Sequence, residues 1–178
     1  GRAFHGRAKL AVAGYPLTSC YLDTSFLTTA IFSSLEHHGA AMVFARQLFD
    51  AGTVIYVSQL VRLEYAHSLK RLAPKLDEET QRRFQLHLWD RQRVRERWMT
   101  HGFGLLNDFL DQFAYAELGM THQVVDDALR LIGTINLESY DAAHAALALA
   151  AEVRNFATID THFMRPQGML TVHIVHDR

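Results

Sequence analysis

The stretch Cys20-Tyr21-Leu22-Asp23-Thr24-Ser25 indicates the fold class of this 178-residue chain. A short apolar run stops at an acid and two hydroxyl residues, which is the pattern of a buried strand that ends in a polar loop. Residues 53–57 and 156–159 are rich in β-branched or aromatic side chains, and residues 171–175 alternate, so three more strands are expected. The segments between these strands have apolar residues at helical spacing. The sequence therefore predicts an α/β fold, a three-layer α/β/α sandwich with a central parallel sheet.

The intervening segments have the apolar spacing of helices, and one part of them is long and highly charged. We interpret the chain as a single domain over residues 1–178, with an elongated helical insertion at about 75–118. Ser58 is a candidate cap for one helix, and Pro74 is expected to end it. Helices are expected over 26–35, 40–49, 59–74, 75–99, 103–118, 124–132 and from Asp141 to about Val153.

The composition is typical of a soluble globular protein, with 49% hydrophobic and 21% charged residues. This balance excludes a disordered chain, a collagen and a coiled coil. The formal net charge of −1 gives the whole molecule no field that attracts polyanions. The single cysteine, Cys20, cannot form an intramolecular disulfide, and the longest apolar run, residues 145–151, is too short to span a membrane. We therefore expect a cytoplasmic protein without a membrane partner.

Four acids have apolar or structured neighbours: Asp23, Glu64, Asp141 and Asp160. Each also has a local interpretation. Asp23 and Asp160 would serve as turn residues at strand ends, Glu64 would form a surface ion pair with a lysine or arginine, and Asp141 would be a helix N-cap. In a parallel sheet, however, the carboxyl ends of the strands meet at one edge, which is where ligands bind. Two like charges ~4 Å apart repel by roughly 4 kcal/mol at an effective dielectric of about 20. Four such carboxylates must raise their pKa values or bind a cation, and oxygen ligands suit Mg²⁺ or Mn²⁺.

These acids lie in short motifs that together resemble the PIN domain family, and most closely the VapC-like toxins of type II toxin–antitoxin systems. The resemblance implies a PIN-like sandwich with the activity of a Mg²⁺- or Mn²⁺-dependent ribonuclease that cleaves single-stranded RNA. It also implies a homodimer and a cognate antitoxin as partners. The four motifs are Tyr21-Leu22-Asp23-Thr24-Ser25, Val61-Arg62-Leu63-Glu64, Asp141-Ala142-Ala143-His144-Ala145-Ala146 and Thr158-Ile159-Asp160-Thr161-His162-Phe163.

The resemblance places Asp23, Glu64, Asp141 and Asp160 in an acidic site that is both catalytic and metal-binding. Asp23 and Asp141 would hold the ion, while Asp160 and Glu64 would orient its waters or complete a second cation site.

Ser25 and Thr158 would fix carboxylate rotamers, unless they only form local turn hydrogen bonds. His162 stands where family members often have another acid. It is either a phosphate-contacting group or a solvated loop histidine.

Basic residues concentrate between Arg62 and Trp98, where the net charge is +4 while the rest of the chain is −5. Aromatic side chains alternate with them, as in surfaces that bind single-stranded nucleic acid. Arg91, Arg93 and Arg95 are the candidate phosphate contacts. The alternative is a solvated helix with internal ion pairs.

Two classes of phosphoryl-aspartate protein also place an acid after the first strand. A phosphoryl-aspartate enzyme of the haloacid-dehalogenase type needs a second Asp two residues after Asp23, where this chain has Ser25. A receiver domain needs a lysine after a late strand, and the last lysine is Lys75. Both fail on chemistry. The remaining alternative is a PIN-like RNA- or protein-binding module with a vestigial acidic site and no catalysis.

Overall fold

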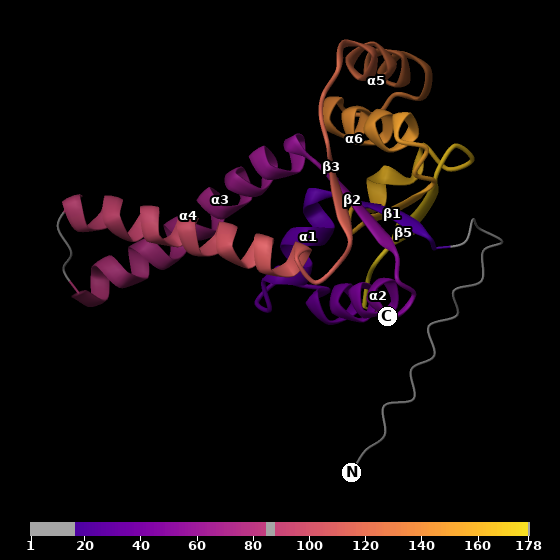
Figure 1. Ribbon diagram of the computed structural model, residues 1–178. Helices are drawn as coiled ribbons and strands as arrows, with labels where there is room; N and C mark the ends of the chain where they lie inside the picture. Colours follow the sequence, from indigo (N-terminus) through magenta and orange to yellow (C-terminus); the bar gives the residue numbers. More distant parts are fainter. Residues whose placement is uncertain (1–16, 85–87, 178) are drawn as a thin grey trace.

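The computed structural model describes residues 17–84 and 88–177, with side chains described except over 73–91. Five parallel strands form one sheet in the order β3-β2-β1-β4-β5, with helices on both sides (Figure 1). This confirms the predicted α/β/α sandwich. The elements are β1 (Ser19–Leu22), α1 (Thr24–Ile31), α2 (His38–Asp50), β2 (Val54–Ser58), α3 (Gln59–Phe84), α4 (Leu88–Leu110), β3 (Tyr115–Leu118), α5 (His122–Ile135), α6 (Ser139–Ala150), β4 (Asn155–Thr158), the 3-10 helix η1 (Thr161–Met164) and β5 (Thr171–Ile174).

The central strand β1 is buried on both faces, as expected for a parallel sheet covered by helices. Because side chains alternate along a strand, Cys20 and Leu22 face one helical layer and Tyr21 faces the other. The first layer contains α1 to α4, and the second contains α5 and α6. Tyr21 pairs in register with Tyr56 of β2 and Phe156 of β4. The end of β1 is therefore the middle of the sheet's carboxyl edge.

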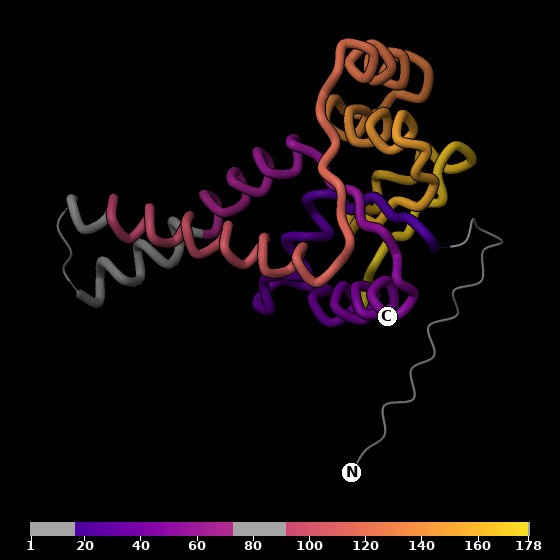
Figure 2. Tube along the Cα trace, in the orientation of Figure 1, coloured from indigo at the N-terminus to yellow at the C-terminus, as the bar shows by residue number. Residues whose placement is uncertain are grey.

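Helices α3 and α4 contact each other and lead away from the sheet (Figure 2). Two expectations for this region are wrong. Helix α3 continues past Pro74 to Phe84, because a proline removes one helical N–H and leaves those of its neighbours in place. Residues 115–118 form strand β3 at the edge of the sheet, where Tyr115 pairs with Ile55, and α4 ends at Leu110. Within the described residues, no helix is both long and apolar enough to cross a membrane.

A close contact joins α3 to α4 at Gly102. The Tyr65 hydroxyl donates a hydrogen bond to the Gly102 carbonyl oxygen at 3.0 Å, and a Cβ at this position would lie 2.5 Å from Leu69 Cδ2. Leu69 is fully buried, so it cannot move without disturbing the core. Gly102→Ala is expected to lower the free energy of unfolding by about 1–3 kcal/mol, measured by urea denaturation.

Gly104 is the matched control for this prediction, because it lies on the same helix and nothing stands within 4 Å of the Cβ it would gain. Gly104→Ala is expected to raise the stability by roughly 0.5–1 kcal/mol through the loss of unfolded-state freedom. Equal changes in the free energy of unfolding for the two substitutions would show that the close approach of Gly102 to Leu69 does not restrict this position.

Candidate active site

Asp23 lies where β1 ends, and its side chain caps the N-terminus of α1. Its Oδ1 accepts the Phe26 backbone N–H at 2.8 Å, and its Oδ2 accepts the Thr158 hydroxyl at 2.6 Å. The Ser25 hydroxyl lies 2.9 Å and 3.0 Å from the two carboxylate oxygens. Burial raises the pKa of Asp23 above its ordinary value, although the hydrogen bonds and the charge of His144 oppose that rise. The structure thus brings Ser25 and Thr158 onto this carboxylate.

Asp160 follows β4, the neighbour of β1 in the sheet. Its backbone N–H donates to Thr158 Oγ1 at 2.9 Å, so one threonine contacts both strand-end acids. Its Oδ1 accepts the His162 backbone N–H at 2.8 Å and lies 3.0 Å from His162 Nδ1. The side chain of His162 is 92% exposed. This loop therefore presents an acid and an accessible imidazole together.

Asp141 lies in the first turn of α6, two residues after the helix begins at Ser139. The N-cap position belongs to Glu138, so the interpretation of Asp141 as an N-cap is wrong. The pKa of Asp141 is raised to about 6, first by burial and then by the charges of Asp160, Asp23 and Glu138, against the opposing charge of His144. Burial and the neighbouring acids therefore both disfavour the charged form of Asp141.

A hollow of about 180 Å³ lies at this acidic edge. Its lining includes three acids, a histidine and an arginine, so it could receive either a cation or a phosphate group. The lining residues are Leu137, Glu138, Asp141, Asp160, His162 and Arg165.

Glu64 lies on α3 and has different partners from the three aspartates. Its Oε2 accepts the Thr24 hydroxyl at 2.5 Å and lies 2.7 Å from His144 Nε2. Burial favours a higher pKa for Glu64, but the hydrogen bond and charge of His144 and the hydrogen bond from Thr24 lower the pKa below its ordinary value. The alternative interpretation of Glu64, a surface ion pair with a lysine or arginine, is replaced by this partly buried contact with histidine.

Sequence reasoning missed two residues of the site, Glu138 and His144. Glu138 borders the hollow, and its charge acts on Asp141. His144 is 4% exposed and acts on Asp23, Glu64 and Asp141. A signal for His144 was present, because a residue three positions after Asp141 lies on the same side of a helix.

The donor set suits a hard divalent cation, since the three aspartates and Glu138 offer only oxygen. Between residues 17–84 and 88–177, no three His, Cys, Asp or Glu side chains lie close enough to hold a metal ion as they stand. The charges of Asp160 and Asp23 both act on Asp141, and a positive charge there would offset this repulsion. The donor atoms therefore suit Mg²⁺ or Mn²⁺ by their chemistry, although their side chains are not arranged as a closed metal site.

The proposed RNA contacts on α4 have described side chains only in part. Arg93 and Arg95 are exposed on this helix. The side chain of Arg91 lies outside the described residues.

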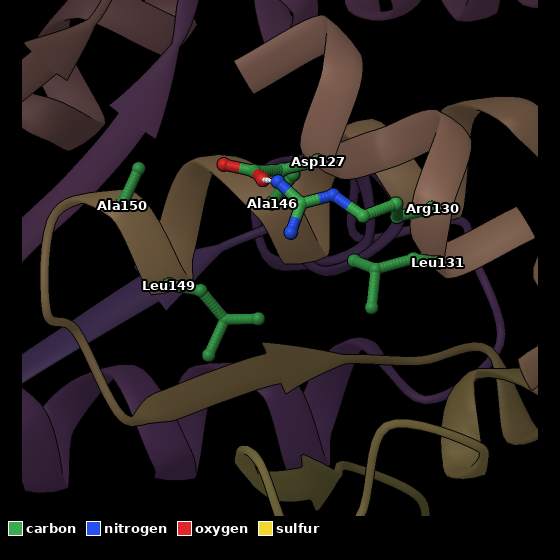
Figure 3. A pocket seen from close by; sticks show the side chains of 6 residues that line it. All are labelled: Asp127, Arg130, Leu131, Ala146, Leu149 and Ala150. Atoms are coloured by element: carbon green, nitrogen blue, oxygen red, sulfur yellow. Dashed lines mark hydrogen bonds and ion pairs between the residues drawn. The ribbon is translucent and has the colours of Figure 1, made fainter. Parts of the chain in front are cut away.

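A second hollow, of about 310 Å³, lies between α5 and α6 (Figure 3). Its two charged residues, Asp127 and Arg130, form an ion pair with each other. The rest of the lining consists of leucine and alanine side chains. This hollow has no group placed for catalysis, so the acidic edge is the better candidate.

The parallel sheet and the acids at its carboxyl edge define an α/β protein with an acidic site where the central strands end. A family model described as PIN domain matches residues 20–168, and the chain belongs to the PIN domain family. No curated protein matches the sequence.

Two solved structures share the fold. One is VapBC2 from Rickettsia felis bound to a DNA fragment from their promoter, with 13% identity, a TM-score of 0.58, and coverage of 87% of this chain and 97% of that one. The other is PAE2754 from Pyrobaculum aerophilum, with 17% identity, a TM-score of 0.51, and coverage of 93% and 90%.

Proposed function

We propose that this PIN domain is a metal-dependent endoribonuclease that cleaves phosphodiester bonds in single-stranded RNA. The observation that supports this most directly is the placement of Asp23 and Asp160 at the ends of the neighbouring strands β1 and β4, where their charges both act on Asp141. Family membership supports the same conclusion. A protein that only bound other proteins would have no need to gather three aspartates where they repel one another.

Asp23, Asp141 and Asp160 are the residues that would hold Mg²⁺ or Mn²⁺, with Glu64 beside them. When bound, the cation would polarise the phosphodiester group and activate water for attack on phosphorus. Thr158 and Ser25 keep the Asp23 carboxylate in a fixed orientation, which preserves the site before the substrate arrives. His162 is accessible enough to contact a phosphate oxygen.

The chain is further proposed to be the toxin of a toxin–antitoxin pair, acting in the cytoplasm as a homodimer. The structural likeness to VapBC2, a toxin–antitoxin assembly, supports this proposal. Co-purification of the chain with the product of an adjoining small reading frame would test it. The antitoxin proposal is rejected if the chain is harmless when expressed alone and binds no such product.

Cleavage of a mixed RNA pool tests the nuclease proposal. We expect products with Mg²⁺ or Mn²⁺ and none with chelator, and Asp23→Asn is the catalytic control. RNA binding without cleavage under every metal condition would instead support the non-catalytic binding module.

Substrate attraction by α4 is a separate prediction. Replacing Arg91, Arg93 and Arg95 with glutamine is expected to reduce the dependence of log Kd on log salt by up to about 2, because each lost phosphate contact in single-stranded RNA removes roughly 0.7. The measurement is fluorescence anisotropy with a labelled RNA at several salt concentrations. An unchanged slope would assign these arginines to a solvated helix surface.

A further inference from the structure

His144 lies at the centre of a buried hydrogen-bond chain that joins four elements around Glu64. Its Nε2 lies 2.7 Å from Glu64 Oε2 on α3, and its Nδ1 lies 2.7 Å from the Tyr21 hydroxyl on β1. The Tyr21 hydroxyl in turn donates to Ser58 Oγ on β2 at 2.8 Å. His144, Tyr21 and Ser58 are each at most 4% exposed. The nuclease site described above does not itself account for this chain of contacts.

The hydrogen bonds fix the position of the His144 ring. The Tyr21 hydroxyl donates to Ser58 Oγ and also lies 2.7 Å from His144 Nδ1, so the phenol oxygen joins the two residues. At the other side of the ring, Nε2 faces an oxygen of the Glu64 carboxylate, which can only accept. His144 therefore uses both ring nitrogens, one toward Glu64 and one toward Tyr21. Its ring also meets the Tyr21 ring edge-on, at 5.7 Å between centroids, which restricts its rotation.

Glu64 is held from two sides as a result. Both the Thr24 hydroxyl of α1 and His144 Nε2 of α6 lie within hydrogen-bond distance of Glu64 Oε2. The Glu64 side chain is still 24% exposed, so without these donors it would sample several rotamers. The two donors therefore select one orientation of a carboxylate that borders solvent.

We propose that His144 is a positioning residue that holds Glu64 in the orientation used by the nuclease site, and that Tyr21 and Ser58 hold His144 in turn. This inference rests on the proposed function, since it gives Glu64 a role in cleavage. It adds a residue that touches neither the cation nor the RNA and acts through Glu64.

Two amide substitutions separate the contacts of His144. The amide nitrogen of glutamine reaches the position of Nε2, so His144→Gln keeps a donor toward Glu64. The shorter His144→Asn reaches only the position of Nδ1, so it keeps the Tyr21 contact and loses the Glu64 contact. We expect His144→Gln to retain most of the cleavage rate. We expect His144→Asn to lower kcat by about 10- to 100-fold with little change in KM.

A double-mutant cycle tests whether His144 acts through Glu64. The variant that combines His144→Asn with Glu64→Gln should cleave within about twofold of Glu64→Gln alone. The melting temperatures of the same four proteins in chelator should show the same non-additivity, which requires neither metal nor RNA.

Two outcomes would overturn the inference. If both amide variants lose cleavage and melting temperature in parallel, His144 is only a packing residue. If the single effects multiply in the double variant, the two residues act independently. Failure of the proposed function would be recognised differently, as a wild type that cuts no RNA with any cation, and the melting cycle would then still decide whether His144 and Glu64 are coupled.

Discussion

Asp23→Asn is expected to reduce RNA cleavage by at least about 100-fold while leaving the fold intact. The substitution removes the negative charge at the middle of the sheet's carboxyl edge, where the proposed cation would be held. It preserves a side-chain oxygen that can accept the Phe26 N–H, so the N-cap of α1 remains. Initial cleavage rates at saturating Mn²⁺, together with circular dichroism, provide the measurement.

Asp126→Asn is the matched control, because Asp126 is an exposed acid of α5 that does not border the acidic hollow. Its cleavage rate should stay within about twofold of the wild type, as expected for a substitution far from the chemistry. If the Asp23→Asn protein is folded and fully active, Asp23 has no role in catalysis.

The layered architecture could be predicted from sequence, because the short apolar runs of the buried strands differ sharply from the helical spacing of the segments between them. The run that ends at Asp23 and the run that ends at Asp160 became β1 and β4, which are neighbours in the sheet. Strand β3 was missed because four residues that alternate in exposure do not distinguish an edge strand from the end of an amphipathic helix. Its identity depends on pairing with β2, which is a tertiary interaction.

The candidate site was predictable where topology alone brings residues together. Asp23 and Asp160 follow adjacent parallel strands, so their proximity follows from the fold class. The partners of Glu64 could not be predicted in this way. His144 is 80 residues away from Glu64 and 123 away from Tyr21, and their contacts depend on how α3 and α6 pack at the sheet edge. A charged residue with an obvious surface interpretation thus proved to have a buried partner.

Asp141→Asn is expected to raise the stability of the metal-free protein at pH 7. The folded pKa of Asp141, about 6, lies above its ordinary value of 3.8. The folded protein therefore binds more protons than the unfolded chain between about pH 4 and pH 6, and stability from this group falls as the pH rises through that window. Removing the charge should recover roughly 1–2 kcal/mol at pH 7, after allowance for solvent screening.

A divalent cation should reverse the relative stability of the wild type and Asp141→Asn. At a concentration of about 100 times its Kd, Mn²⁺ would stabilise the wild type by roughly 2.7 kcal/mol, while the variant, which lacks one of the carboxylates, would gain much less. Melting curves in chelator and in Mn²⁺ should therefore cross, with the variant more stable in the first and the wild type more stable in the second. A large loss of stability in chelator would mean that the Asp141 carboxylate supports α6 as a structural group. Equal stabilisation of both proteins by Mn²⁺ would mean that the cation binds elsewhere, because a site that depends on this charge cannot keep its affinity after the charge is removed.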